Sequence, residues 1–315
     1  EFRVRAVNGN LVPTTYAASV TTRTLPTLPG IPGTPVALAL SSGDVRWSWT
    51  PATDAASYEL YLSSKTTELI GTTATTTATL RGFDPNSASA IVVRAVNATG
   101  SGSFSASAVA YSSAVTPASF AVASVSSDTV SLTWGAAGNP SGTVYEVEEG
   151  TDGVTYLPFS TTTAVTLPAG GLAPASTHWF LVRALNGDSF PTAYAAAVTT
   201  RTLPTLPGIP GTPVAVAQST ADISWSWTAA SGASGYQVYR ASQTSELLAS
   251  PTAAGFVLTG LGPNGLSGIV VRAVNATGAG VLSAAATAYS LASTPASFAL
   301  SAVSSAAISL SWGAA

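Results

Sequence analysis

Apolar and polar residues alternate with a period of two through most of the chain. In the stretch 57–64, Tyr58, Leu60 and Leu62 share one face, and the residues between them share the other. The alternating runs are short, rich in Thr, Val, Ile, Tyr and Trp, and separated by Gly, Pro, Asn, Asp and Ser. This pattern predicts an all-β protein of half-buried strands joined by turns, as in a β-sandwich. No segment shows a convincing helical period.

The pattern also repeats after 178 positions. The run TTRTLPTLPGIPGTPVA occupies residues 21–37 and recurs at 199–215, and RAVNATG at 94–100 recurs at 272–278. No gap is needed to align the copies, which indicates a tandem array. A period this long exceeds the roughly 20–50 residues of a solenoid repeat and suits two domains of about 90 residues.

Similarity at half the period favours two related unit types, which we call type A and type B. RAVN at Arg94 resembles RALN at Arg183, and Trp49 resembles Trp134. Each type is predicted to have seven strands. For type A we expect them near 36–41, 44–50, 57–63, 68–71, 76–81, 89–97 and 104–111. For type B we expect them near 118–124, 129–134, 143–149, 154–158, 163–167, 178–186 and 193–200.

The two ends of the chain fall inside type B units. Residues 1–24 match 179–202, and residues 294–315 match 116–137, so we expect a stretch of a longer array. The expected divisions are the C-terminal part of a type B sandwich with a proline-rich linker (1–30), type A (31–115), type B (116–203), type A with its linker at 204–213 (204–293), and the N-terminal part of a type B sandwich (294–315).

The motif residues of both unit types, and the order in which they follow one another, resemble those of fibronectin type III domains. That family has an inward Trp on its second strand, an aromatic residue at the start of its third, and a Leu-x-Pro corner before a long alternating strand. The resemblance implies tandem seven-stranded sandwiches and covers the whole chain. The structural core residues that it assigns here are Trp49, Trp134, Trp227, Tyr58, Tyr145, Tyr236 and Leu172, with His178 at the corner.

The corner departs from the resemblance. Where the family usually has a Tyr six residues after the corner Leu, this chain has His178 in type B, and Ser89 and Ser267 in the two type A units. A serine can still form a hydrogen bond but loses the buried ring area. We therefore expect a less firmly pinned corner in type A and a structural hydrogen bond from His178.

The amino-acid composition excludes several classes of binding partner and site. Charged residues make up only 8% of the chain, against about 25% in an average globular protein. The net charge of −3 argues against nucleic acid as a partner. No apolar run approaches the ~20 residues of a membrane span. The absence of Cys rules out disulfides and zinc–thiolate sites without fixing the compartment.

Few residues are candidates for chemistry. His178 is the only histidine, and we expect no carboxylate or nucleophile partner in its neighbourhood. Glu146, Glu148 and Glu149 are expected on a solvated outer face, although paired carboxylates can also serve acid–base chemistry or bind calcium. Trp47 and Trp49 share a face and are expected in the core, although an aromatic strip can also bind sugar. We therefore predict no catalytic residue, no cofactor and no metal ligand set.

Two segments match the N-glycosylation pattern, at Asn97 and Asn275, and the many Ser and Thr residues can carry O-linked sugar. In the linker, Pro26, Pro29, Pro32 and Pro35 recur at every third position. We expect this linker to be stiff and extended, with a backbone poorly suited to strand pairing.

Two functions remain open at this point. The first is the structural repeat region of a long extracellular filament, sheath or surface fibre that associates with identical chains. The alternative is an adhesin, or a carbohydrate- or protein-binding spacer array, of a secreted multidomain protein. Both place the chain outside the cell or at its surface, and neither is enzymatic.

Overall fold

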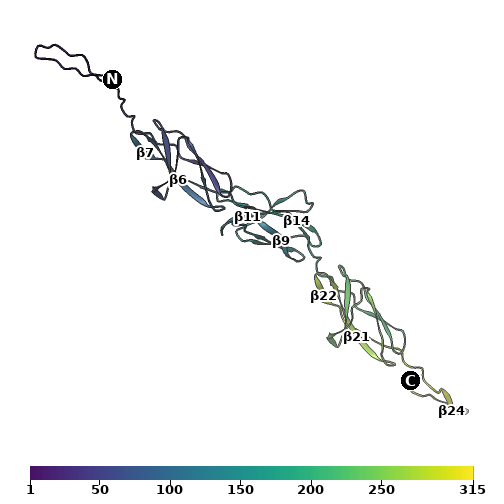
Figure 1. Cartoon of the computed structure of the whole chain (residues 1–315). Helices are drawn as coiled ribbons and strands as arrows, with labels where there is room; N and C mark the ends of the chain where they lie inside the picture. Colours follow the sequence, from purple (N-terminus) through teal and green to yellow (C-terminus); the bar gives the residue numbers. More distant parts are fainter. Residues whose placement is uncertain (315) are drawn as a thin grey trace.

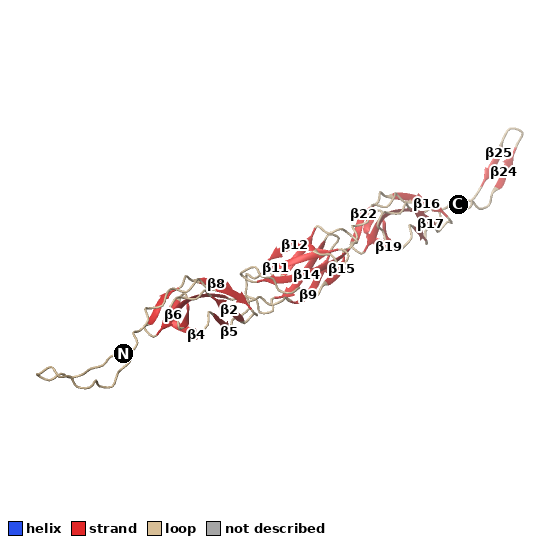
Figure 2. Ribbon diagram, turned by 90° about the horizontal axis from the view of Figure 1, so that it is seen from above, coloured by secondary structure: helices blue, strands red, loops and turns tan. Residues whose placement is uncertain are grey.

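The computed structural model describes residues 1–314, and every regular element in them is a β-strand. Three β-sandwiches follow one another in a row and form an elongated rod (Figure 1). A hairpin extends from each end of this row, and the two ends of the chain lie far apart (Figure 2). The all-β prediction is confirmed. In the part of the chain that the structure describes there is no helix that could cross a membrane.

Each sandwich has the same division of strands between two sheets. The first type A unit contains β1 (Val36–Ala39), β2 (Asp44–Ser48), β3 (Ser57–Leu62), β4 (Lys65–Thr73), β5 (Thr77–Arg81), β6 (Ala88–Asn97), β7 (Gly100–Phe104) and β8 (Ala108–Tyr111). One sheet has the order β1-β2-β5, and the other has β4-β3-β6-β7, with β8 also paired to β6.

The type B unit contains β9 (Ala118–Val125), β10 (Thr129–Gly135), β11 (Val144–Gly150), β12 (Leu157–Thr162), β13 (Thr166–Gly170), β14 (Thr177–Leu185) and β15 (Val198–Arg201). Its sheets have the orders β13-β10-β9 and β12-β11-β14-β15. All described pairings are antiparallel.

The second type A unit repeats the first. It contains β16 (Val214–Ala217), β17 (Ile223–Ser226), β18 (Gly235–Arg240), β19 (Gln243–Ala249), β20 (Gly255–Leu258), β21 (Leu266–Asn275), β22 (Gly278–Leu282) and β23 (Ala286–Tyr289). Its sheets are β16-β17-β20 and β19-β18-β21-β22, with β23 paired to β21. The C-terminal hairpin is β24 (Ala299–Val303) with β25 (Ile308–Ser311).

The last predicted strand of type A is interrupted. We expected one strand over 104–111, but β7 and β8 are separate segments on the same neighbour, β6. Ser105 lies at the break, and its Oγ accepts a hydrogen bond from the backbone N–H of Val93 at 3.0 Å. The side chain thus takes a place that a backbone carbonyl would occupy in a regular ladder. Ser283 makes the equivalent bond to Val271 at 3.1 Å in the second type A unit.

Each unit has a separate hydrophobic core between its two sheets. In each core a Trp ring meets a Tyr ring edge to face, with centroids 5.4–5.5 Å apart. These pairs are Trp49 with Tyr58, Trp134 with Tyr145, and Trp227 with Tyr236. Trp47 is fully buried beside the first pair, and Leu172 is buried at the type B corner. The three clusters share no residue, so each unit can fold around its own core.

The corner serines of type A agree with the less firmly pinned corner that we expected. Ser89 and Ser267 are buried, and among the described residues neither Oγ has a hydrogen-bond partner. A buried hydroxyl without a partner loses its hydration without compensation. The type A corner therefore carries a small energetic cost at this position.

Substituting Ser89 with Ala should raise the free energy of unfolding of the first type A unit by about 1 kcal/mol, because the unpaired hydroxyl is removed. Ser105→Ala is the matched control, since it deletes a serine whose Oγ is bonded, and should lower stability by a similar amount. Differential scanning calorimetry of both variants measures the two shifts. Equal losses of stability in both variants would contradict the assignment.

Candidate functional site: the joints between units

The linker before each type A unit is docked along that unit. Pro29, Pro32 and Pro35 are all buried, whereas Pro26 is exposed. An extended proline-rich segment has three residues per turn, so every third residue faces the same side. Pro207, Pro210 and Pro213 are buried in the same way in the second copy. The linker is extended as expected, but it is packed against the domain and does not hang free between domains.

Two glycines let this linker approach the sandwich. The N–H of Gly30 donates to Thr53 O at 3.0 Å, and the N–H of Gly33 donates to Thr50 O at 3.2 Å. A Cβ at Gly33 would lie 2.0 Å from Thr50 Oγ1, so the Thr50 hydroxyl would have to turn away to admit any other residue. The alternation of Pro and Gly in the linker therefore combines a stiff apolar edge with backbone donors.

The Asn at the end of the RAVN strand fastens the linker from the other side. Asn97 Nδ2 donates to Thr27 O at 2.6 Å and to Asp54 O at 3.0 Å, and Thr99 Oγ1 donates to Pro26 O. In the second copy, Asn275 Nδ2 donates to Thr205 O at 2.7 Å and to Gly232 O at 3.1 Å. Both amide hydrogens are used in each case. The Asn thus joins the linker to a loop of the type A unit.

At the joint from type B to type A, two neighbouring residues are bonded to different units. On the type B side, the Leu203 N–H donates to Ser126 O at 2.9 Å, and the Leu203 carbonyl accepts from Ala175 N at 3.1 Å. On the type A side, the carbonyl of the next residue, Pro204, accepts from Thr277 Oγ1. The two units are therefore held by consecutive residues.

The joint from type A to type B uses direct contacts between the sandwiches. Asn186, at the end of the equivalent strand of type B, donates from Nδ2 to Ser112 O at 3.2 Å. The Gly187 N–H donates to Asn86 Oδ1 at 2.7 Å, and Asp188 Oδ2 accepts from Tyr111 N at 2.8 Å. The loop 186–188 of type B is thus bonded to two loops of the preceding unit.

Further bonds brace the same joint. Asn86 Nδ2 donates to Thr143 Oγ1 of type B at 3.0 Å. Asn139 binds the connecting residue Val115 in both directions, with Oδ1 accepting from Val115 N at 2.8 Å and Nδ2 donating to Val115 O at 2.7 Å. A Cβ at Gly187 would lie 2.4 Å from the Tyr111 ring, so the close packing requires glycine here. Both joints are therefore specific contacts.

Asn275→Asp should loosen the joint between type B and the second type A unit. A carboxylate has no donor and would face two carbonyl oxygens in place of an amide that binds both, at a cost of about 2–3 kcal/mol in local joint stability. Gln218→Glu makes the same chemical change at an exposed position of the same unit. Small-angle scattering should show a broader range of shapes for the first variant alone. Identical profiles for the two variants would exclude this role.

The glycosylation pattern falls on the same two asparagines. Because Asn97 and Asn275 already use both Nδ2 hydrogens within the joint, a glycan on either one would have to replace a hydrogen that now bonds to a backbone carbonyl. Glycosylation at these positions remains a prediction, and it competes with the joint.

His178 lies in a polar cluster that we did not expect. It is 3% exposed, its Nδ1 lies 2.7 Å from Glu149 Oε1, and its Nε2 lies 2.6 Å from Ser176 Oγ. The expectation that no carboxylate or hydroxyl partner lies nearby is therefore wrong. The structural hydrogen bond expected of His178 is present, and it connects β14 to β11.

The order of hydroxyl, imidazole and carboxylate in this cluster resembles that of a hydrolytic triad. However, Ser176 Oγ also contacts the Ala173 carbonyl, which already provides an acceptor for its single proton. The backbone N–H of Ser176 donates to Thr202 Oγ1 at 3.1 Å, directly after the last strand β15. These bonds anchor the corner of type B to its last strand, close to the joint at Leu203.

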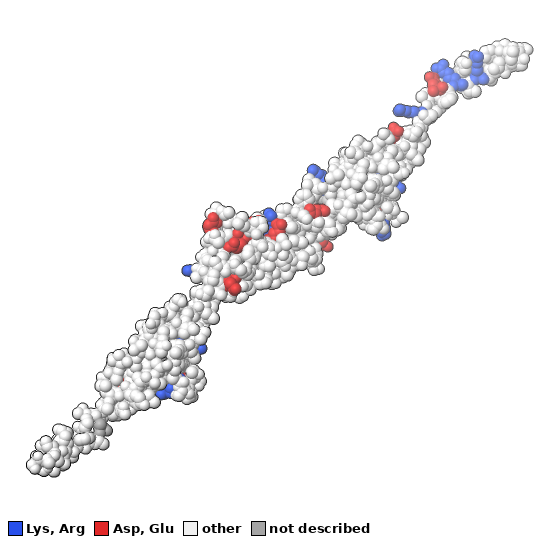
Figure 3. All heavy atoms as spheres, turned by 180° about the vertical axis from the view of Figure 1, so that it is seen from behind, with Lys and Arg blue, Asp and Glu red and all other residues white. Residues whose placement is uncertain are grey.

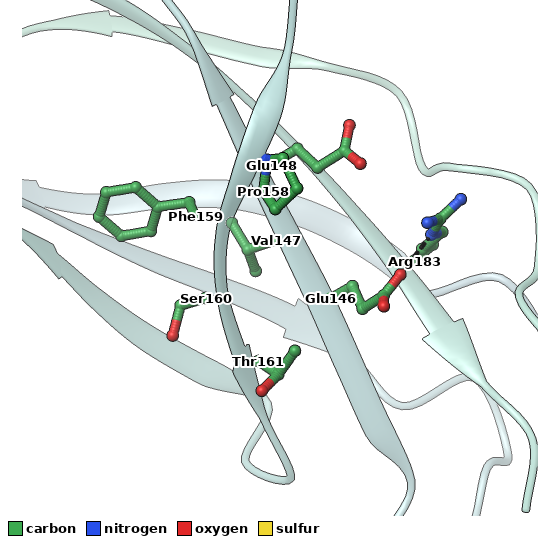
Figure 4. Close-up of a pocket in the computed structure, with 8 residues that line it drawn as sticks. All are labelled: Glu146, Val147, Glu148, Pro158, Phe159, Ser160, Thr161 and Arg183. Carbon is green, nitrogen blue, oxygen red and sulfur yellow. Dashed lines mark hydrogen bonds and ion pairs between the residues drawn. The ribbon is translucent and has the colours of Figure 1, made fainter. Parts of the chain in front are cut away.

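The other two glutamates of β11 are also paired. Glu146 Oε2 accepts from Arg183 Nε at 2.7 Å, and Figure 4 shows the two side chains directed toward one another. Tyr194 OH donates to Glu148 Oε1 at 2.5 Å, and the Arg183 guanidinium lies 4.6 Å from the centre of the Tyr194 ring. Burial first, and then this bond to Glu148, raise the pKa of Tyr194 to about 12. The expected solvated face is thus a small ionic network.

A shallow groove beside this network, about 270 Å³ in volume, is bordered by Glu146, Glu148, Pro158 and Arg183. Figure 3 shows that acidic side chains gather on the middle sandwich, the type B unit. In residues 1–314 no group of three or more His, Asp or Glu is placed to hold a metal ion.

The sequence pointed to the linker but not to the residues that hold it. Asn97 reaches across 70 positions to Thr27, and no local pattern shows such a bond. One sequence signal did indicate these residues. The identical run RAVNATG continues past the end of the strand at Asn97, into the residues that contact the linker. The alternation of β11 also places Glu149 on the same face as Tyr145 and Val147, toward the interior.

Comparison with known proteins adds three findings. No family model matches the chain. The chain is 35% identical to endoglucanase B of Cellulomonas fimi over 265 residues, covering 75% of this chain and 25% of the relative. It is 29% identical to exoglucanase B of the same species over 278 residues, covering 80% of this chain and 24% of the relative. The chain thus spans about a quarter of the length of these curated relatives.

The strand order decides the fold. In all three complete units the first, second and fifth strands form one sheet, and all the remaining strands form the other. The chain is a tandem array of fibronectin type III-like β-sandwiches. The crystal structure of chicken CNTN1 FN1–FN3 domains overlaps it with a TM-score of 0.35 and 18% identity, covering 84% of this chain and 99% of that one.

Proposed function

We propose that this fibronectin type III-like array is a stiff structural region of a long extracellular filament, sheath or surface fibre. The observation that carries the proposal is the joint between type B and type A, where Leu203 is bonded to one unit and Pro204 to the next. A region of this kind holds its units in fixed relation and transmits force along the chain. Its role is mechanical, and no catalytic residue is assigned.

Extracellular placement is part of the proposal. The similarity to endoglucanase B and exoglucanase B supports this placement. Lateral association with identical chains is proposed as well, because few charges oppose it. Val36 and Leu38 are 67% and 51% exposed on the edge strand β1, and Val214 and Val216 are each 63% exposed on the equivalent β16. Surface glycans on Ser and Thr remain compatible with this arrangement.

A second candidate function is a spacer within a secreted multidomain protein, with or without binding of carbohydrate or protein. The observation that favours it is the similarity to about a quarter of endoglucanase B. In that setting the rigid joints would set the distance between other domains.

Electron microscopy of the native assembly tests the proposal. A filament protein should show an ordered lattice with an axial repeat of about 60–80 Å for each pair of units, estimated from strands of ~5–7 residues that run along the rod. Separate straight rods at all concentrations would support the spacer and exclude the filament. Bent beads would exclude both, because they would show that the joints are flexible.

A further inference from the structure

The chain contains three Asn–Gly steps, at Asn8, Asn186 and Asn264. Asparagine is chemically labile, and most so before glycine, where no side chain hinders the following backbone nitrogen. That nitrogen attacks Cγ of the Asn, a new N–Cγ bond forms, and the Cγ–Nδ2 bond breaks with loss of ammonia. Water then opens the cyclic imide to aspartate or isoaspartate. The reaction needs a free nitrogen and a side chain that can turn toward it.

Asn8 and Asn186 occupy the same loop in two copies. Asn8 Oδ1 accepts from Asn10 N at 3.0 Å and from Val12 N at 2.9 Å. Asn186 Oδ1 accepts from Asp188 N at 3.1 Å and from Phe190 N at 2.8 Å. Leu11 and Ser189, at matching positions, have φ of 62° and 64°. The conformation of the two loops is therefore the same.

What differs is the contact with a preceding type A unit. Asn186 is 4% exposed, its Nδ2 donates to Ser112 O, and the Gly187 nitrogen donates to Asn86 Oδ1. In the hairpin at residues 1–20, Asn8 is exposed, and within the described residues neither its Nδ2 nor the Gly9 nitrogen has a hydrogen-bond partner. At Asn186 the joint therefore adds bonds to the leaving amide and to the attacking nitrogen, beyond those that the loop itself makes.

We propose that Asn186 is a deamidation site that is protected while the joint between type A and type B is closed. When the joint opens, the Gly187 nitrogen loses its acceptor and Asn186 becomes free to cyclise. The product is a carboxylate that cannot donate to Ser112 O or to Tyr111 O, so the joint does not recover its bonds. A transient opening is thereby converted into a permanent covalent mark.

The third Asn–Gly pair, Asn264 with Gly265, serves as an internal reference. The Gly265 nitrogen donates to Gly262 O at 3.0 Å and to Ser290 Oγ at 2.9 Å, and both partners belong to its own type A unit. Asn264 is therefore protected by a turn within its unit, and the state of the joint does not affect it.

Peptide mapping by mass spectrometry after incubation of the whole chain in mildly alkaline buffer tests the proposal. Asn186 should deamidate at least about tenfold more slowly than Asn8, because the bonds of Asn186 Nδ2 and of the Gly187 nitrogen across the joint must first open. Equal rates at the two positions, or an intact Asn8, would overturn the proposal.

A substitution distinguishes protection by the joint from protection by the loop itself. Asn86→Gly removes the acceptor of the Gly187 nitrogen, and glycine suits the left-handed φ of 50° at this position. It should accelerate deamidation of Asn186 by about five- to tenfold, and leave Asn8 and Asn264 unchanged in the same molecule. An unchanged rate at Asn186 would show that the joint does not protect it. An increase at all three positions would show general unfolding and would also count against the proposal.

Discussion

Replacing Trp47 with alanine should destabilise the first type A unit by about 3–5 kcal/mol, the largest effect that we expect from a single substitution. Trp47 is 0% exposed and lies between the two sheets beside Trp49 and Tyr58. Removing the ring leaves a cavity that strands held in a ladder cannot close. In calorimetry, the transition of this unit should fall by more than about 10 °C.

The other two units serve as references within the same molecule. Because the three cores share no residue, the transitions of the type B unit and the second type A unit should stay in place. Trp47→Phe is the matched control. Trp47 Nε1 has no hydrogen-bond partner among the described residues, so this change loses volume but no bond and should cost only about 1 kcal/mol. A loss of stability shared by all units would show that they do not fold separately.

Replacing His178 with phenylalanine should destabilise the type B unit by about 2–3 kcal/mol. The ring area remains, but Glu149 and Ser176 both lose their partner. The cost stays below that of a fully buried pair because the Glu149 side chain is 21% exposed and can be partly hydrated. Differential scanning calorimetry should show the shift in the transition of the type B unit, while the transitions of the two type A units stay in place.

Glu149→Gln separates charge from hydrogen bonding in the same cluster. The amide oxygen can still accept from His178, so the variant should lose less than about 1 kcal/mol if the bond is what stabilises the corner. A loss as large as that of His178→Phe would instead show that the negative charge is required.

The strands could be predicted from the sequence because the alternation of apolar and polar residues within each strand shows which face is buried. The edges of β2, β3, β6 and β14 fall within two residues of the predicted positions. The interruption between β7 and β8 could not be foreseen, because it depends on Ser105 meeting Val93 on another strand. Alternation alone does not say which Ser will take the place of a backbone partner.

The candidate site was predictable only in part, for the same reason. The spacing of prolines in the linker showed a stiff segment, but not that the segment lies against the unit after it. His178 and Glu149 are 29 positions apart, and their contact requires the register of β11 with β14. Such contacts become visible only when the strands are placed side by side.

The contacts at the two joints restrict the order in which the two unit types can follow one another. A type A unit carries its own connector, since the bonds of the linker at 204–213 are made to type A. A type B unit, by contrast, needs a neighbour that offers Asn86, and the matching position in type B is Ala175, which shares its left-handed φ but has no amide. Type B can therefore be followed by type A but is poorly suited to follow itself. A gene duplication that preserved both joints would therefore have to copy a type A unit and a type B unit together.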